Sequence, residues 1–157
     1  MNIELWSLGK ENTKLVDKAI DEYVTRLNRY NSFNLVTIDN AKLTKSLPKN
    51  QLLEKEADLI LDKLQDRDIL IVLDEKGKQF TSKEFAEKIN QFMNLSPLRI
   101  IFLIGGSFGI ADKLKTKAHL VLGLSAFTFP HQLVRLLFTE QLYRAFTILK
   151  NEKYHHE

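Results

Sequence analysis

The segment 98-LRIIFLIGGSFG-109 joins an apolar run, interrupted only by Arg99, to three glycines within five residues. An apolar run of this length, following a proline, is typical of a strand. Glycine loses more conformational entropy on folding than other residues, so a cluster of glycines marks backbone that turns sharply or is approached closely. The segment therefore predicts a buried strand that ends in a loop where something lies against the main chain.

Strand and helix patterns alternate on both sides of this segment. Strands are expected at 3–8, 33–38, 68–73, 98–104 and 119–124, and helices at 13–30, 51–64, 82–94, 110–118 and 131–149. Residues 41–49 contain three lysines, no acidic residue and Pro48, and are expected to form a loop. The alternation predicts an α/β fold with a mostly parallel sheet and helices on both faces. Residues 1–157 show no linker or repeat, so a single domain is expected.

The composition limits the function classes. The chain has 157 residues, of which 44% are hydrophobic and 27% charged, as in an ordinary globular protein. It has no cysteine, which excludes disulfides and thiolate metal sites, and no metal is expected. Neither a signal peptide nor a membrane span is visible, so a cytoplasmic location is expected. The net charge of +3 is compatible with a nucleic-acid partner and equally with a normally solvated surface.

The helix expected at 131–149 carries apolar residues around nearly its whole circumference. A helix that is apolar all round is buried on more than one side. In a chain of this size the additional side predicts a subunit interface, and an isologous homodimer is the commonest arrangement. Burial of the entire helix within one chain is the alternative.

Three predicted strand ends carry unusual sequences, at 73–78, 105–109 and 123–130. Ligands of open α/β sheets bind beyond the carboxyl ends of the strands. The glycines form G-G-x-x-G without a following lysine, which fits neither a dinucleotide fingerprint nor a P-loop. A phosphate cradle is therefore disfavoured, and an adenine ring between apolar walls is the better hypothesis. The alternative is that these are tight turns beside ordinary core residues.

Five sequence segments together resemble the RlmH family of bacterial methyltransferases, which belongs to the knotted SPOUT superfamily. They are GGSFG at 105–109, LSAFTFPH at 124–131, VR at 134–135, EQLYRA at 140–145 and YH at 154–155. The resemblance extends over essentially the full chain. It implies a deep trefoil knot at about 98–150, S-adenosylmethionine as cofactor and a homodimer as the active unit. The implied reaction is methyl transfer to N3 of a pseudouridine in 23S ribosomal RNA of the assembled ribosome.

Carried onto this chain, the resemblance implies a set of cofactor contacts. They are Leu73, Gly105, Leu124, Ser125, Ala126, Phe127, Thr128 and Phe129. Gly105 and Gly106 are then expected to be bare so that the cofactor can lie against main chain, and Gly109 to allow the turn into the next helix. Phe108 departs from the small polar or acidic residue that is frequent in the family.

The implied acceptor, N3 of pseudouridine, is a weakly acidic imide nitrogen that attacks well only after losing its proton. A general base or a cation that stabilises the anion is therefore expected. His155 is the candidate for the base or for contact with the base edge, and Tyr154 for stacking on the target base. Arg144 is expected to bind RNA phosphate or polarise a carbonyl, or else to pair with Glu140 four residues earlier.

Basic residues on the surface of the dimer are expected to bind the substrate RNA. The candidates are Lys10, Lys14, Arg26, Arg29 and the lysines at 42, 45 and 49. Two other functions stay open: a knotted methyltransferase acting on transfer RNA or another ribosomal position, and a ribosome-associated factor without catalytic activity.

Overall fold

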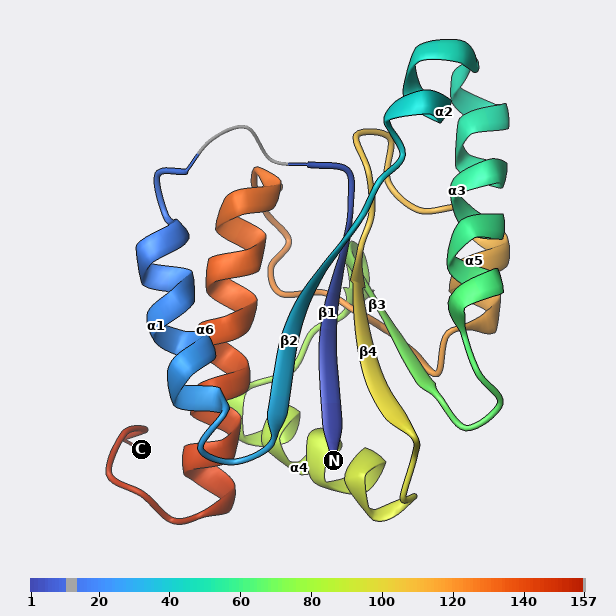
Figure 1. Ribbon diagram of the computed structural model, residues 1–157. Coiled ribbons are helices and arrows are strands. Elements are labelled where there is room, and N and C mark those ends of the chain that lie inside the picture. Colours follow the sequence, from blue (N-terminus) through green and yellow to red (C-terminus); the bar gives the residue numbers. More distant parts are fainter. Residues whose placement is uncertain (11–13, 157) are drawn as a thin grey trace.

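The fold is built on one parallel five-stranded sheet, seen in a computed structural model that describes residues 1–10 and 14–156 (Figure 1). The strands are β1 (Asn2–Leu8), β2 (Ser32–Ile38), β3 (Ile69–Lys78), β4 (Arg99–Ile104) and β5 (Leu120–Leu122). Their order across the sheet is β2-β1-β4-β3-β5, and every neighbouring pair is parallel. All strands therefore end at the same edge of the sheet.

The helices are α1 (Asp17–Leu27), α2 (Ala41–Ser46), α3 (Lys49–Lys63), α4 (Ser82–Asn94), α5 (Asp112–Lys117) and α6 (His131–Leu149). Helices α1, α4 and α6 cover one face of the sheet, and α3 and α5 cover the other (Figure 1). Successive residues of β4 alternate between these faces: Phe102 packs into the first core, and Ile101 and Leu103 into the second. The predicted α/β fold with a parallel sheet between two helical layers is confirmed.

Helix α6 is covered over most of its circumference by its own chain. It packs against α1 and α4, and Phe138, Leu142 and Phe146 are fully or almost fully buried. On the remaining side Leu133 and Leu137 are each 39% exposed. These two residues are four positions apart, so they form one outward stripe.

Two element predictions are wrong. The expected loop at 41–49 contains α2 and the first residue of α3. Asp39 Oδ1 accepts the Ala41 N–H at 2.9 Å at the start of α2, and the half-buried Leu43 and Leu47 give it an inner side. The three lysines are exposed, so their charges do not oppose the helix.

The second error concerns the end of β3, which continues to Lys78 instead of ending at residue 73. Its pairing with β5 shifts register, because both Leu73 and Lys78 are opposite Leu122. Residues 74–77 therefore leave the ladder and bulge at the carboxyl edge. The predicted start of the first helix at Thr13 lies outside the described residues.

No helix within the described residues is long and apolar enough to cross a membrane.

Candidate cofactor pocket and C-terminal cluster

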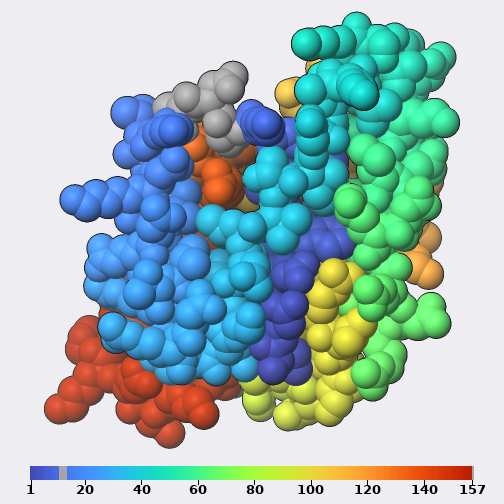
Figure 2. All heavy atoms as spheres, viewed as in Figure 1, coloured from blue at the N-terminus to red at the C-terminus, as the bar shows by residue number. Residues whose placement is uncertain are grey.

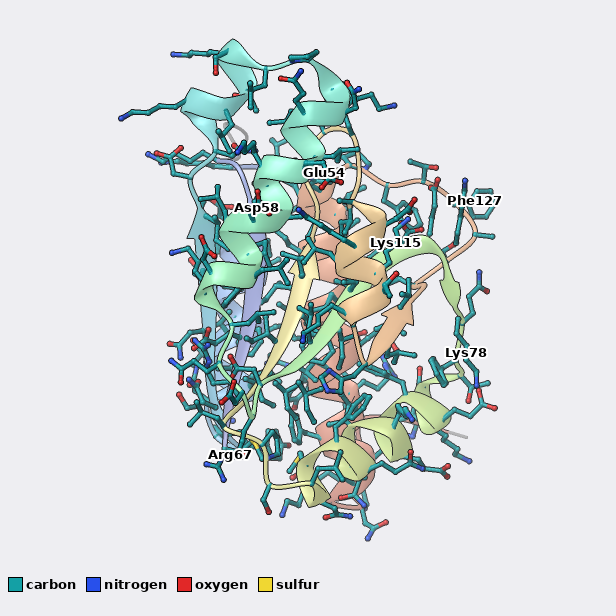
Figure 3. The ribbon with its side chains drawn as sticks, turned by 90° about the vertical axis from the view of Figure 1, so that its right-hand side faces the viewer. Glu54, Asp58, Arg67, Lys78, Lys115 and Phe127 are labelled. Carbon is teal, nitrogen blue, oxygen red and sulfur yellow. The ribbon has the colours of Figure 1, made fainter. Side chains whose placement is uncertain are left out.

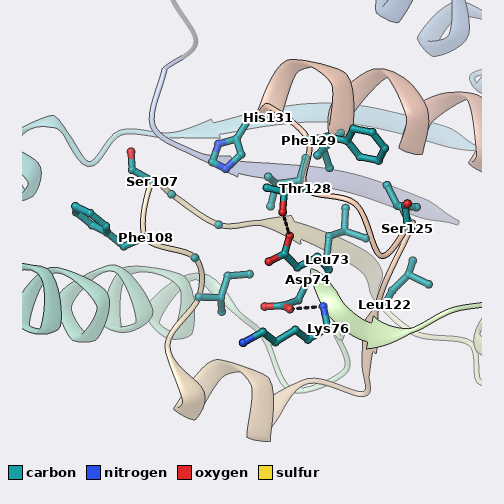
Figure 4. Close-up of a pocket in the computed structure, with 18 of the residues that line it drawn as sticks. Leu73, Asp74, Lys76, Ser107, Phe108, Leu122, Ser125, Thr128, Phe129 and His131 are labelled. Carbon is teal, nitrogen blue, oxygen red and sulfur yellow. Dashed lines mark hydrogen bonds between the residues drawn. The ribbon is translucent and has the colours of Figure 1, made fainter.

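The three predicted loops meet around one cavity of about 530 Å³ at the carboxyl edge of the sheet (Figure 4). Strand β3 contributes Leu73 and, from its bulge, Asp74; the glycine loop contributes residues 105–109, and the segment after β5 contributes Leu124 and Thr128. Helix α6 adds His131 and Val134 from its first turn. A cavity of this size at this edge is typical of a ligand site in a parallel α/β sheet.

The structure brings together seven of the eight residues that were expected to contact the cofactor. Those that line the cavity are Leu73, Gly105, Leu124, Ser125, Phe127, Thr128 and Phe129. Ala126 lies on the exposed side of the same loop, outside the cavity lining. Sequence reasoning did not single out Asp74, Lys115 or Ile104, which also line it. Asp74 directly follows a predicted strand, and this position could have identified it.

The apolar wall and the charged rim of the cavity come from different elements. The apolar wall is formed by buried residues: Leu73 just before the bulge of β3, and Ile104 and Leu122 at the ends of β4 and β5. Asp74 Oδ1 accepts the Lys76 N–H at 2.8 Å, and its Oδ2 lies 3.0 Å from Lys115 Nζ. Burial by itself would raise the pKa of Asp74, but these two contacts outweigh it and the pKa is lowered. Asp74 is therefore an anion at neutral pH.

A second carboxylate connects two of the loops. Glu75 on the bulge accepts a hydrogen bond from the Thr128 hydroxyl (Figure 4). In the same loop Ser125 Oγ accepts the Phe127 N–H at 3.1 Å. The segment at 124–129 is thus held both to itself and to the end of β3.

The glycines have an internal reason for lacking side chains. A Cβ on Gly105 would lie 2.5 Å from Ile110 Cγ1 and 2.6 Å from the Gly109 carbonyl oxygen, and one on Gly106 would lie 2.9 Å from Glu56 Oε2. Gly109 has φ +86° and makes the turn, as predicted. Packing inside the protein is therefore sufficient to explain why Gly105 and Gly106 lack side chains, and the absence of a side chain at these positions does not by itself indicate a ligand.

The three predicted catalytic residues lie together at the far end of α6. Arg144 donates to Glu140 Oε1 through Nε at 3.0 Å and Nη2 at 2.6 Å, which confirms the predicted ion pair. Tyr154 donates to the same oxygen at 3.1 Å. The Arg144 Nη1 lies 3.2 Å from His155 Nδ1. The C-terminal segment therefore folds back onto α6 of its own chain.

This C-terminal cluster of Glu140, Arg144, Tyr154 and His155 is separate from the pocket. Arg144 follows Val134 by ten residues, which is about 15 Å along a helix axis. Figure 1 shows the C-terminal segment at the opposite end of α6 from the carboxyl edge of the sheet. Within one chain, the structure brings the pocket residues together and the catalytic candidates together, but not the two groups with each other.

Comparisons with known proteins agree with this arrangement. A family described as "Predicted SPOUT methyltransferase" matches residues 1–155. The ribosomal RNA large subunit methyltransferase H of Christiangramia forsetii is 47% identical over 156 residues, 99% of each chain, and that of Flavobacterium johnsoniae is 46% identical over the full length of both. The chain belongs to the RlmH family of SPOUT methyltransferases. It is therefore an S-adenosylmethionine-dependent methyltransferase, and the resemblance read from its sequence is confirmed.

A solved structure shares the fold of this SPOUT methyltransferase. A probable methylase family protein from Haemophilus influenzae Rd KW20 superposes with a TM-score of 0.56 at 15% identity, over 99% of this chain and 70% of that one. At this identity the likeness concerns the fold alone.

The pocket of this SPOUT methyltransferase fits the chemistry of S-adenosylmethionine. Its apolar wall suits a flat adenine ring, and the Asp74 and Glu75 carboxylates suit hydroxyl groups or positive charges. The main chain of the glycine loop offers further polar groups. The donor set thus matches a ligand that combines an apolar ring with polar and cationic groups.

Proposed function

We propose that this chain methylates N3 of a pseudouridine in 23S ribosomal RNA of the assembled ribosome. The single observation that carries the proposal is the convergence of three loops on one pocket at the carboxyl edge, in a chain of the RlmH family. The relatives are named for methylation of large-subunit ribosomal RNA. S-adenosylmethionine supplies an electrophilic methyl group when it is bound.

The pocket residues hold the cofactor in this proposal. Leu73 and Leu124 would hold the adenine, Gly105 and the main chain of 124–129 would bind polar groups of the cofactor, and Asp74 would balance positive charge. The protein then contributes chiefly by placing the methyl group and the acceptor nitrogen in line.

The C-terminal cluster acts on the acceptor. A guanidinium only donates hydrogen bonds, so His155 Nδ1 accepts from Arg144 and a neutral ring carries its proton on Nε2. Burial, followed by hydrogen bonds with Tyr23 and Glu140, raises the pKa of Tyr154, so its phenol stays neutral. In this arrangement the N3 proton passes to water, and Arg144 and His155 stabilise the imide anion that remains, while Tyr154 stacks on the target base.

A homodimer brings the two groups together. The outward stripe of Leu133 and Leu137 lies along α6 between the pocket at one end and the C-terminal cluster at the other. Two α6 helices that pair antiparallel about a two-fold axis would put the cluster of one chain beside the pocket of the other. Phe127, 78% exposed at the rim, would be covered by the partner (Figure 3).

The proposal includes the domain organisation and the location. Residues 1–157 act as a single SPOUT methyltransferase domain in the cytoplasm, with a deep trefoil knot at about 98–150. The chain crosses from the α5 face to the α6 face after β5, and Gly123 N–H donates to the Lys78 carbonyl at 3.0 Å there. This crossing is compatible with threading of α6 through the preceding loops, which is rare in protein folds.

Transfer of a radiolabelled methyl group to ribosomes that lack this modification tests the function. Ribosomes should be labelled and bulk transfer RNA should not, and mass mapping should place the methyl group on a pseudouridine of 23S ribosomal RNA. Labelling of transfer RNA instead would overturn the substrate. Absence of cofactor binding in calorimetry, with and without ribosomes, would favour a non-catalytic ribosome-associated factor.

Complementation tests the dimeric site. An Arg144→Ala chain and a chain whose pocket is blocked by a bulky side chain at its exposed rim, Thr128→Trp, should each be inactive alone. Co-expression should restore part of the activity if pocket and cluster come from different chains. If the mixture is inactive while heterodimers form, the shared site is wrong.

A further inference from the structure

Three exposed lysines stand on one corner of the molecule beside the mouth of the pocket. Lys42 and Lys45 lie on α2, and Lys49 is the first residue of α3. Residues 40–53 contain no aspartate or glutamate. Figure 2 shows α2 and the start of α3 projecting from the body of the protein at the upper right. We call this surface the α2–α3 corner.

The acidic residues near this corner are already engaged. Glu54 and Asp58 both pair with Lys113, at 2.9 and 2.7 Å (Figure 3). Glu56 is 3% exposed and bonded to Asn40. Among the residues that the structure describes, the exposed acid that remains beside the corner is Asp39, and its Oδ1 accepts the Ala41 N–H. The corner therefore has a local excess of positive charge.

An exposed aromatic ring lies next to this charge. Phe108, at the tip of the glycine loop, is 51% exposed, and Lys49 Nζ lies 5.5 Å from the centre of its ring. Both residues line the mouth of the pocket. Figure 4 shows the Phe108 ring directed away from Leu73 and Thr128, toward the outside. The Phe108 ring is therefore an apolar surface exposed to solvent at the mouth of the pocket, where the proposed acceptor base enters.

We propose that Phe108 and the α2–α3 corner form an RNA-binding rim on the pocket. Phe108 stacks on an unpaired base adjacent to the methylated nucleotide, while Lys42, Lys45 and Lys49 contact the phosphates on either side. The inference rests on the proposed function, because it names the part of this chain that grips the acceptor RNA.

Charge complementarity favours RNA over a protein partner at this surface. Lysines that neutralise phosphates supply affinity independent of sequence, and aromatic side chains stack on bases that have left a helix. The target base itself must be unpaired to enter the pocket, so its neighbours in the strand are accessible for stacking. An aromatic ring with an adjacent ammonium group at the pocket mouth matches this pair of requirements.

Substitutions at the rim test the proposal through the KM for assembled ribosomes that lack the modification. Phe108→Ala should raise this KM by about tenfold with little change in kcat, since loss of a stacked base has an effect of that order. Phe108→Tyr should restore the wild-type KM. Binding of S-adenosylmethionine, measured by calorimetry, should be unchanged in both variants, which separates the rim from the cofactor site.

The lysines are tested by the salt dependence of ribosome binding. Changing Lys42, Lys45 and Lys49 together to Gln should weaken binding and lower the slope of log K against log salt by about 2. A control variant removes the same charge from exposed residues that precede β3 and β5 at the amino edge of the sheet, with Lys63, Arg67 and Lys117 changed to Gln. It should keep the wild-type slope.

The outcomes distinguish the rim from the proposed function. Equal slopes for the two triple variants, or an unchanged KM for Phe108→Ala in an active enzyme, would overturn the rim. A shift of Phe108→Ala toward monomer in sedimentation would identify the surface as a protein interface and also overturn it. Failure of the wild-type chain to methylate assembled ribosomes overturns the proposed function, and the rim is then tested by ribosome binding alone.

Discussion

Arg144 Nη1 lies 3.2 Å from His155 Nδ1, and the same guanidinium donates twice to Glu140 Oε1. This chain of contacts fixes a polar C-terminal segment that otherwise has little reason to be ordered. Tyr154 adds a ring contact, since its centroid lies 4.7 Å from that of Tyr143 at an interplanar angle of 76°. The segment is therefore a preformed part of the protein.

Deletion of residues 153–157 should abolish methylation and leave the fold intact. The lost contacts are few and close to the surface, so we expect a cost of about 1 kcal/mol in unfolding free energy and a fall in Tm of roughly 3 °C. Methyl transfer to ribosomes measures the first effect and thermal unfolding the second. Full activity of the truncated chain would refute the role of the C-terminal cluster.

Tyr154 should tolerate loss of its hydroxyl better than loss of its ring. Its raised pKa keeps the phenol neutral, so proton transfer is not its role. Tyr154→Phe should keep activity within about fivefold, since the lost hydrogen bond to Glu140 has a net value of about 1 kcal/mol. Tyr154→Ala should lose activity by about 30-fold, because a stacked base contributes roughly 1–3 kcal/mol. Equal losses in kcat for the two variants would contradict stacking.

The sequence predicted the sheet well because its strands are long apolar runs. Residues 98–104 are apolar except for Arg99, so side chains directed to either face of the sheet are apolar. Strand β4 is covered on both faces, as that pattern requires. The bounds of α4 were predicted at 82–94 and are confirmed, and Thr81 with Glu84 forms a capping box there. Local sequence patterns were sufficient to predict an element where they agreed with the burial of its residues in the fold.

The sequence could not give what depends on pairing between distant segments. The bulge at 74–77 arises from the register of β3 against β5, and its reason lies in Gly77 and Gly123, whose backbones approach each other closely. The separation of Arg144 from the pocket follows from the length and direction of α6, which a motif does not reveal. The reason for Gly105 likewise became visible only with Ile110 in place.

Gly105→Ala should damage the pocket more than Gly109→Ala. A Cβ on Gly105 meets the Gly109 carbonyl at 2.6 Å, so main chain must move, and we expect a cost of about 1–3 kcal/mol with at least tenfold weaker cofactor binding. A Cβ on Gly109 meets nothing within 4 Å and is opposed only by φ +86°, at about 1 kcal/mol. Urea unfolding and calorimetry with S-adenosylmethionine measure both. Unchanged cofactor binding in Gly105→Ala would remove this loop from the site.

Glu56 should make stability fall with rising pH, and Glu56→Gln should remove that dependence. Burial raises the pKa of Glu56, and the hydrogen bond from Asn40 offsets this only in part. Because the folded chain holds the proton more tightly than the unfolded chain, stability decreases as pH rises from the ordinary carboxyl pKa through the raised one, and stays lower above it.

A neutral amide of the same shape can still accept the Asn40 N–H and has no charge to bury. Glu56→Gln should therefore match the wild type near pH 4 and exceed it at pH 8 in urea unfolding. Asp58→Gln, which changes a half-buried carboxylate two positions along α3, serves as control and should show no such gain. If the free energies of unfolding of Glu56→Gln and wild type differ by the same amount at pH 4 and pH 8, the pKa of Glu56 is not raised by burial.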